Sequence, residues 1–172
     1  VKENVAFPCT MVDRIVPATT DDALDASSTA LGTRDEMALQ TEPFKQWVIE
    51  DKFTAPRPKW EKVGAQIVKD VAAYEAMKLR LLNGSHSTIA YLGYLGGHKT
   101  VANAMTVPEF KSFVRQFIDE EVSRMLDIHK GCDATKYQAD LFCRFSNSTL
   151  DHNTWQIAMD GSQKLPQQLL GT

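Results

Sequence analysis

An apolar spacing of three and four residues in the middle of the chain most constrains what the chain can fold into. The apolar positions are Trp60, Val63, Ile67, Val71, Tyr74, Leu81 and Leu82. Side chains with this spacing share one face of an α-helix, so we expect one long helix from about Lys59 to Leu82. A cation, Lys78, stands in this stripe where an apolar residue belongs.

Lys78 has two interpretations. A lysine beside a core commonly packs its methylene groups against apolar neighbours and keeps its charge in water. A lysine withdrawn from water is instead driven toward the neutral amine, which can accept a proton at pH 7. On a continuous helix, Glu75, Lys78, Asn83 and His86 fall within an arc of about 140°, so the four side chains can line one cavity. A bend at Gly84 would change that arc.

A lysine base beside asparagine and histidine donors suits the interconversion of a carbonyl and an alcohol. The lysine moves the proton, and the donors stabilise the oxyanion. Taken singly, Asn83 and His86 also fit two structural roles, a helix-end cap and a core histidine. The functional hypothesis therefore depends on their combination with Lys78.

Composition excludes several classes of protein. A chain of 172 residues with a net charge of −3 fits one globular domain with a sizeable core. Its acidic balance and scattered basic residues do not form the field that nucleic acid requires. No apolar run of about eighteen residues and no secretory signal is present, so we expect a cytoplasmic protein without a membrane segment.

The cysteines and histidines do not predict a metal site. The three cysteines are Cys9, Cys132 and Cys143. An odd number without paired spacing indicates reduced thiols. His129 with Cys132 resembles half a zinc site, but His98 and His152 add no ligand spacing, so we expect no metal.

The first part of the chain combines strand and helix signals. Val5–Pro8 and Met11–Pro17 are β-prone and bounded by proline, which predicts a connecting segment with strand character. A helix should follow, with a polar start at Thr20–Asp22 and a stop at Gly32. One short strand is expected within Glu42–Glu50.

Helices should dominate the second half. Thr106–Glu109 reads as a capping box with Pro108 near the first helical position. The stripe that follows is interpreted as core and consists of Phe110, Phe113, Val114, Phe117, Ile118, Val122 and Met125. Two more helices are expected at about 133–145 and 150–159, the second ended by residues 160–162. The pattern predicts a mainly α fold with little strand.

Three glycines, Gly93, Gly96 and Gly97, punctuate the apolar segment that follows Gly84. They follow a helix rather than a strand and lack the spacing of a phosphate-binding loop. We therefore expect close helix packing or a turn there.

Four blocks of sequence together resemble the C-terminal domain of the polyol-specific long-chain dehydrogenases, the mannitol dehydrogenase family. The blocks are Phe7–Pro17, Glu42–Asp51, Lys78–His86 and Trp155–Pro166. The resemblance implies a multi-helical C-terminal domain of a two-domain dehydrogenase. Residues 1–20 would be a linker or the tail of an N-terminal Rossmann domain, and residues 21–172 the helical substrate domain.

The cofactor in this family is a dinucleotide, and the resemblance implies NAD without a metal. No Gly-x-Gly-x-x-Gly motif follows a strand in this sequence, so none of its residues is assigned to cofactor binding. We expect NAD to be bound mainly by the Rossmann domain of the full-length protein, and this chain to be inactive alone.

The resemblance also implies roles for individual residues. Lys78 matches the general acid/base, Asn83 the asparagine that stabilises the oxyanion, and His86 a donor that orients the substrate. Glu75 matches a proton-relay position, with an i,i+3 ion pair to Lys78 as the alternative.

Three further residues are candidates for substrate binding. Arg144 matches an arginine that contacts substrate, with a surface or helix-end charge as the alternative. Arg14 and Asp13 belong to the first block, and a substrate carboxylate requires a cation such as Arg144 or Arg14.

The blocks are most similar to the hexuronate branch of the family. That branch implies interconversion of a keto-hexuronate and an aldonate, D-fructuronate and D-mannonate. A polyol 2-dehydrogenase of the mannitol or arabinitol type is the alternative, because polyol members carry similar residues. The sequence departs from the family pattern near the expected substrate pocket, where Ser148 replaces a common proline and Asp151 adds negative charge. A non-catalytic helical interaction domain is a third interpretation, against which the intact Lys78, Asn83 and His86 set argues.

Overall fold

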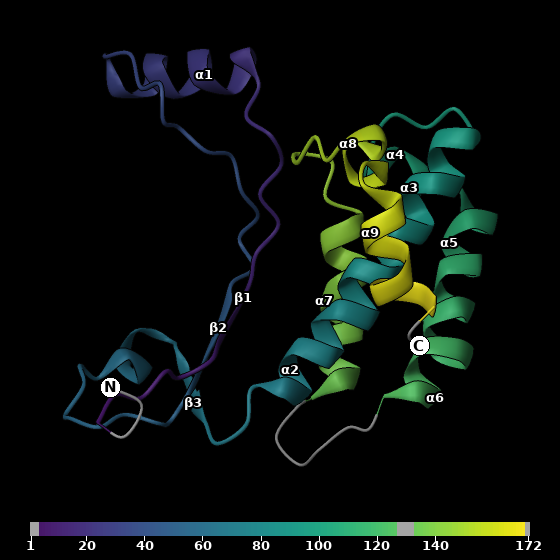
Figure 1. Cartoon of the computed structure of the whole chain (residues 1–172). Coiled ribbons are helices and arrows are strands. Elements are labelled where there is room, and N and C mark those ends of the chain that lie inside the picture. The colour runs from purple at the N-terminus through teal and green to yellow at the C-terminus, as the bar shows by residue number, and fades with distance from the viewer. Residues whose placement is uncertain (1–3, 127–132, 171–172) are drawn as a thin grey trace.

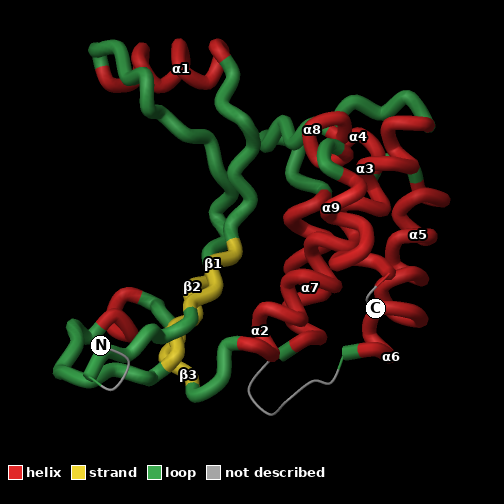
Figure 2. The backbone as a smooth tube through the Cα atoms, viewed as in Figure 1, coloured by secondary structure: helices red, strands yellow, loops and turns green. Residues whose placement is uncertain are grey.

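The computed structural model describes residues 4–126 and 133–170 (Figure 1). A small sheet and an extended arm lie on one side, and a body of helices lies on the other (Figure 2). The sheet consists of β1 (Thr10–Asp13), β2 (Gln46–Glu50) and β3 (Gln66–Val68). Strand β2 is central, antiparallel to β1 and parallel to β3. The mainly α prediction, with a short strand segment near the N-terminus, is confirmed.

Helix α1 (Asp21–Leu31) forms where the sequence predicts it. The Thr20 hydroxyl accepts a hydrogen bond from the Ala23 N–H, and Gly32 adopts the left-handed conformation with φ 70°. The helix lies at the far end of the arm, away from the helical body (Figure 1).

The predicted helix from about Lys59 to Leu82 does not form in its first half. Residues Trp60–Val63 form only the 3₁₀ turn η1, which ends at Gly64 with φ 98°. A left-handed residue cannot continue a right-handed helix, and the β-branched pair Ile67 and Val68 joins the sheet. Helix α2 (Ala72–Met77) begins only after Asp70, whose carboxylate accepts from the Ala72 N–H.

From α2 onward the chain is helical to Leu95. The π-helix η2 (Lys78–Gly84) leads directly into α3 (Ser85–Leu95). Gly84 keeps helical dihedral angles of −60° and −49°, so it does not interrupt the helix. A π-helix is rare and frequently occurs at functional sites.

The next helical segments are α4 (Val101–Ala104), α5 (Pro108–Gln116), the π-helix η3 (Phe117–Val122) and α6 (Ser123–Met125). Pro108 opens α5, but the capping box is wrong, because the Thr106 hydroxyl donates to the Asn103 carbonyl oxygen instead. The centre of the predicted stripe is buried at Val114, Ile118 and Val122, whereas Phe113 and Met125 at its edges are exposed.

The last helices are α7 (Ala134–Phe145), α8 (Thr154–Ala158), α9 (Gly161–Leu165) and the π-helix η4 (Pro166–Leu170). The predicted helix at 150 begins later, since Asn153 caps α8 by accepting from the Trp155 N–H. Helix α8 ends at Ala158, where Met159 becomes extended, close to the predicted end. Asp160, with φ 59°, precedes α9, and neither α9 nor η4 was expected.

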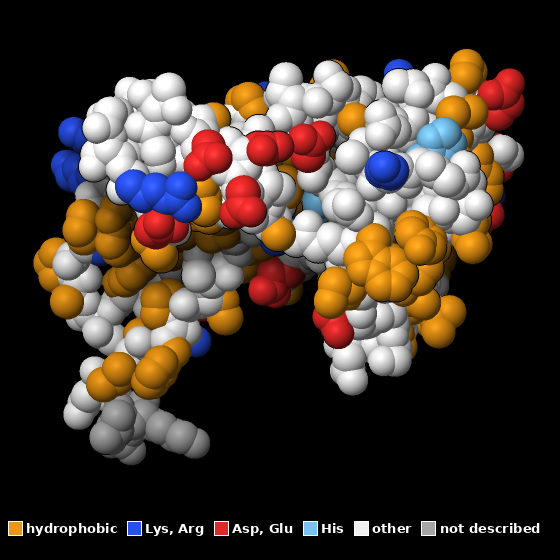
Figure 3. Space-filling view, turned by 90° about the horizontal axis from the view of Figure 1, so that it is seen from above, with side chains coloured by type: hydrophobic (Ala, Val, Ile, Leu, Met, Phe, Trp, Pro, Cys, Tyr) orange, Lys and Arg blue, Asp and Glu red, His pale blue; other side chains and the backbone are white. Residues whose placement is uncertain are grey.

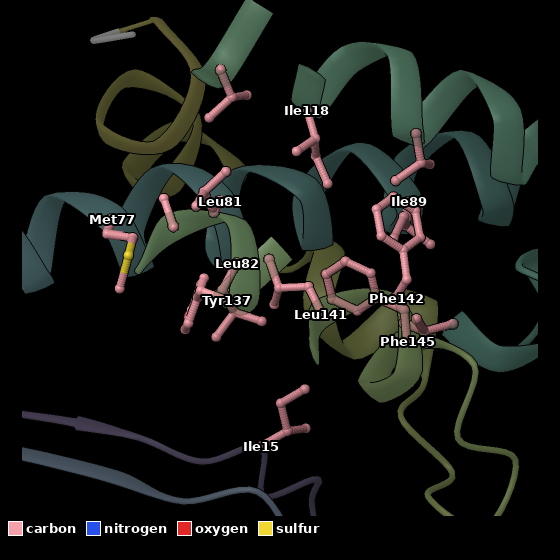
Figure 4. Close-up of a cluster of buried hydrophobic side chains, with 14 of the residues drawn as sticks. Ile15, Met77, Leu81, Leu82, Ile89, Ile118, Tyr137, Leu141, Phe142 and Phe145 are labelled. Carbon is pink, nitrogen blue, oxygen red and sulfur yellow. The ribbon is translucent and has the colours of Figure 1, made fainter. Parts of the chain in front are cut away.

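The core lies between the helical stretch from α2 to α3 and helix α7. Apolar side chains of η2, α3 and α7 meet Ile118 of η3 there (Figure 4). The largest fully buried apolar side chains include Leu81, Ile89, Leu141 and Phe145. Gly93 permits close packing as predicted, because a Cβ there would lie 3.2 Å from the Ala104 Cβ, and Gly97 makes a turn with φ 81°.

Charges are mixed on the face shown in Figure 3, where basic side chains form separate groups rather than a stripe. Within the described residues, no helix is long and apolar enough to cross a bilayer. Cys9 and Cys143 are free and exposed. The half metal site, His129 with Cys132, lies outside the described residues, and within them no three potential metal ligands gather.

Candidate active site

A cavity of about 270 Å³ opens beside the junction of η2 and α3. Asn83 comes from η2 and His86 from α3, and side chains from the C-terminal helices close the opposite wall. The complete lining is Asn83, His86, Ser87, His152, Gln156, Ile157, Lys164 and Gln168. The polar side chains of this lining can donate and accept hydrogen bonds with a hydroxylated small molecule.

His86 is a buried, neutral group at this cavity. Burial first, and then the charges of His152 and Arg144, lower the pKa of His86 well below its usual range. Its ring packs 4.9 Å from the Phe145 ring, and its Nε2 has no hydrogen-bond partner among the described residues. A neutral imidazole with a free ring nitrogen can donate to, or accept from, a substrate hydroxyl.

His152 stands beside His86. The two rings are perpendicular with centroids 4.8 Å apart, and the His152 Nδ1 likewise lacks a partner within the part of the chain that the structure describes. Burial lowers the pKa of His152 to about 4, so both rings are neutral at pH 7. Two unpaired imidazole nitrogens next to one polar cavity can serve hydroxyl groups of a bound molecule.

Lys78 begins the π-helical turn that carries Asn83. Asn83 follows Lys78 by five positions, which is the i to i+5 span of a π-helical hydrogen bond, so the two residues lie about one turn apart on the same side of the helix. The sequence-based prediction that Lys78 and Asn83 share one face assumed an ordinary α-helix. In the structure, the π-helical turn η2 brings them to the same side.

The structure separates Lys78 from the lining of the cavity. The Lys78 ammonium is partly buried and donates from Nζ to the Val12 carbonyl oxygen at 2.6 Å. Glu75 is exposed, and among residues 4–126 and 133–170 no ion pair joins it to Lys78. Thus Asn83 and His86 share one cavity, and Lys78 lies one π turn before it.

Arg144 and Asp13 lie in a buried ion cluster with Glu42. Arg144 Nη2 lies 2.7 Å from Asp13 Oδ1 and 2.8 Å from Glu42 Oε1. Arg144 Nη1 and Nε donate to the other two carboxylate oxygens. Burial opposes the charged guanidinium, but the hydrogen bonds to Asp13 and Glu42 outweigh it and raise the pKa of Arg144. Arg14 donates from two nitrogens to the Glu42 carbonyl oxygen.

Five polar residues of the cavity were not predicted from the sequence as substrate contacts. These are Ser87, His152, Gln156, Lys164 and Gln168. Gln156 and Lys164 fall within the fourth resembling block, and His152 was considered only as a metal ligand. The C-terminal wall of the cavity depends on η4 folding back against η2. The Ser87 hydroxyl of α3 donates to Gln168 Oε1 of η4 at 2.6 Å.

Comparison with known proteins gives two matching family models. Residues 70–172 match the mannitol dehydrogenase C-terminal domain, and residues 1–62 match the mannitol dehydrogenase Rossmann domain. The boundary between the two models lies at residues 62–70, near η1 and β3, whereas the sequence-based division was placed at residue 20.

Individual relatives cover the chain almost completely. D-mannonate oxidoreductase of Escherichia coli K12 is 55% identical over 170 residues, which are 99% of this chain and 35% of that protein. The structure of Pseudomonas fluorescens mannitol 2-dehydrogenase in a ternary complex with NAD and D-mannitol is 42% identical. It superposes with a TM-score of 0.86 over 96% of this chain and 34% of its own. A substrate-free D-sorbitol dehydrogenase is 34% identical with a TM-score of 0.89 over 99% of this chain and 35% of its own. The chain therefore spans about a third of the length of these relatives.

Proposed function

Because the chain belongs to the mannitol dehydrogenase family, we propose that it forms the proton-transfer side of an NAD-dependent secondary-alcohol dehydrogenase. The observation that carries this proposal is the π turn η2, which aligns Lys78 with Asn83 one turn before the neutral His86. A movable proton and two uncharged donors are the groups that carbonyl reduction requires.

The residues present do not fit a dinucleotide site. The described residues that match the Rossmann model form strands β1 and β2, helix α1 and the turn η1, and the sequence lacks the glycine-rich turn that holds a pyrophosphate. NAD supplies or accepts a hydride when it is bound. We assign its binding to other parts of the full-length protein.

The residues of this chain then act on the substrate oxygen. Lys78 gives a proton from its ammonium to the growing alkoxide during reduction, and its neutral amine takes that proton back from the alcohol during oxidation. Asn83 donates to the same oxygen, and His86 holds a neighbouring hydroxyl. Glu75 is exposed one turn before Lys78, which suits the proposed exchange of protons with solvent.

For the substrate we propose the D-fructuronate and D-mannonate pair. The similarity to D-mannonate oxidoreductase supports this choice, and so does Lys164, a cation at the cavity that can face a carboxylate. Arg144 and Arg14, the cations named from the sequence, already bind carboxylate and carbonyl oxygens of the chain. A polyol 2-dehydrogenase is the second candidate, favoured by the similarity to mannitol 2-dehydrogenase bound to D-mannitol.

A substrate panel tests the proposal. NADH oxidation by the full-length protein is measured with fructuronate, tagaturonate, fructose and ribulose at equal concentrations. We expect the highest kcat/KM with fructuronate. Preference for fructose would select the polyol function, and no oxidation with any ketone would contradict the dehydrogenase assignment.

A further inference from the structure

The buried cluster of Asp13, Glu42 and Arg144 joins the two parts of the chain that match different family models. Asp13 and Glu42 lie within residues 1–62, and Arg144 lies in α7 within residues 70–172. The side chains are at most 4% exposed, so loss of one partner leaves a buried charge without its pair. A buried charge cluster of this kind holds its members in one arrangement.

Further contacts fix the cluster from both sides. The Tyr137 hydroxyl of α7 donates to Asp13 Oδ2 at 2.5 Å, and the Ile15 N–H donates to Glu42 Oε1 at 2.6 Å. The Arg144 guanidinium stacks 3.9 Å from the centre of the Phe44 ring. Every carboxylate oxygen in the cluster is therefore bonded, and the arginine has little freedom to turn toward a ligand.

The cluster is one peptide unit away from the contact of Lys78. Lys78 Nζ donates to the carbonyl oxygen of Val12, the residue before Asp13. That carbonyl and the Asp13 Cα belong to one planar peptide group. An anchor on the Asp13 side chain therefore restrains the direction in which the Val12 carbonyl points.

We propose that the Asp13–Arg144–Glu42 cluster is a positioning device for Lys78. It anchors β1 to α7 so that the Val12 carbonyl oxygen meets the Lys78 ammonium and fixes it at the start of the π turn. Arg144 is thus a positioning residue for Lys78, acting through β1. The consequence for catalysis rests on the proposed acid/base function of Lys78, but the positioning itself does not.

The test measures the reactivity of Lys78 in the complete 172-residue chain, without substrate or cofactor. Reductive methylation with formaldehyde and cyanoborohydride is followed for each lysine by peptide mass spectrometry. Arg144→Gln removes the centre of the cluster, and Tyr137→Phe removes only one hydroxyl contact to Asp13. The matched control is Arg34→Gln, because Arg34 binds one aspartate and one glutamate on the exposed surface.

We expect Arg144→Gln to raise the methylation rate of Lys78 about tenfold, since the amine loses a fixed acceptor. Tyr137→Phe should raise it about threefold. Rates at the exposed Lys99 and Lys111 should stay unchanged in all variants, and Arg34→Gln should leave Lys78 unchanged. A circular dichroism melt identifies a variant that fails to fold, and Tyr137→Phe then decides the question.

Unchanged Lys78 reactivity in the folded Arg144→Gln and Tyr137→Phe chains would overturn the positioning role. An equal rise at all lysines would also overturn it, because that result indicates general loosening. Neither outcome depends on catalysis, so failure of the substrate panel leaves this test intact.

Discussion

The imidazole rings of the buried His86 and the partly buried His152 are neutral beside the polar cavity. Because of this burial, the free energy of unfolding depends on pH. Burial lowers the pKa of His152 to about 4, against about 6.5 for an unfolded histidine. As the pH falls from about 6.5, the unfolded chain takes up the proton first, so the folded state loses stability down to pH 4. His86 acts in the same direction.

We predict that His152→Gln flattens this pH dependence. The free energy of unfolding is measured by urea denaturation between pH 7.5 and 4.5. For each pH unit of acidification, this free energy should fall by up to about 1.4 kcal/mol more in the native chain than in the variant. His98→Gln, at a partly buried histidine outside the cavity, is the control and should keep the native slope. Equal slopes in His152→Gln and the native chain would refute the neutral buried state of His152.

Asn83 is the simplest test of oxyanion stabilisation. In the full-length protein, Asn83→Ala should lower kcat about a hundredfold with a smaller change in KM, since the bond to the alkoxide strengthens in the transition state. Asn103→Ala, at an exposed asparagine of α4, should leave both constants unchanged. A rise in KM with normal kcat would assign Asn83 to ground-state binding instead.

Lys164 is the cation at the cavity that remains able to meet a substrate carboxylate. Among the described residues, its Nζ donates a single long bond of 3.2 Å, to the Ile157 carbonyl oxygen. We expect Lys164→Gln to raise KM for fructuronate about tenfold and KM for neutral fructose much less. Lys136→Gln, at an exposed lysine of α7, is the control. Equal losses with both ketones would argue against a carboxylate contact.

At the scale of elements, the π turn η2 is held by the last helical segment of the described chain. A Cβ on Gly84 would lie 3.0 Å from the Gln168 carbonyl oxygen, so η4 packs directly on the backbone of η2. The same contact places Gln168 beside Ser87 at the cavity. The geometry of the site thus depends on a glycine between two of its residues.

Gly84→Ala should therefore destabilise the fold, although glycine to alanine in a helix normally stabilises it by about 0.5–1 kcal/mol. We expect a net loss of about 1–2 kcal/mol in urea denaturation, because the methyl group displaces η4. Ser112→Ala, at an exposed position of α5, should be neutral or slightly stabilising. A variant as stable as the native chain would show that η4 does not pack against η2.

Local sequence signals predicted the elements whose ends are set by neighbouring residues. They failed for elements whose conformation depends on contacts between residues far apart in the sequence. Thr20 and Gly32 delimit α1 because a cap and a left-handed stop act within a few residues. The stripe from Trp60 failed because Gly64 and the pairing of β3 with β2 depend on the fold around them. The π turns cannot be read from periodicity, and Lys164 reaches the cavity only through the return of α9.

For the molecule as a whole, the buried Asp13–Arg144–Glu42 cluster joins the part that matches the Rossmann model to the part that matches the C-terminal model. The helical body supplies Lys78, Asn83 and His86, and the sheet side supplies the Val12 carbonyl that holds Lys78. The family match and the coverage of about a third of each relative agree with a unit that acts within a longer protein.

Single-turnover kinetics of the full-length protein isolate the hydride-transfer step, in which Lys78 is proposed to transfer the proton. NADH absorbance is followed by stopped flow after enzyme and NADH are mixed with excess ketone. We predict that Lys78→Ala slows hydride transfer by about a thousandfold at pH 7, while Lys99→Ala, at an exposed lysine, matches the native rate. A single-turnover rate of Lys78→Ala within a few fold of the native enzyme would contradict the account.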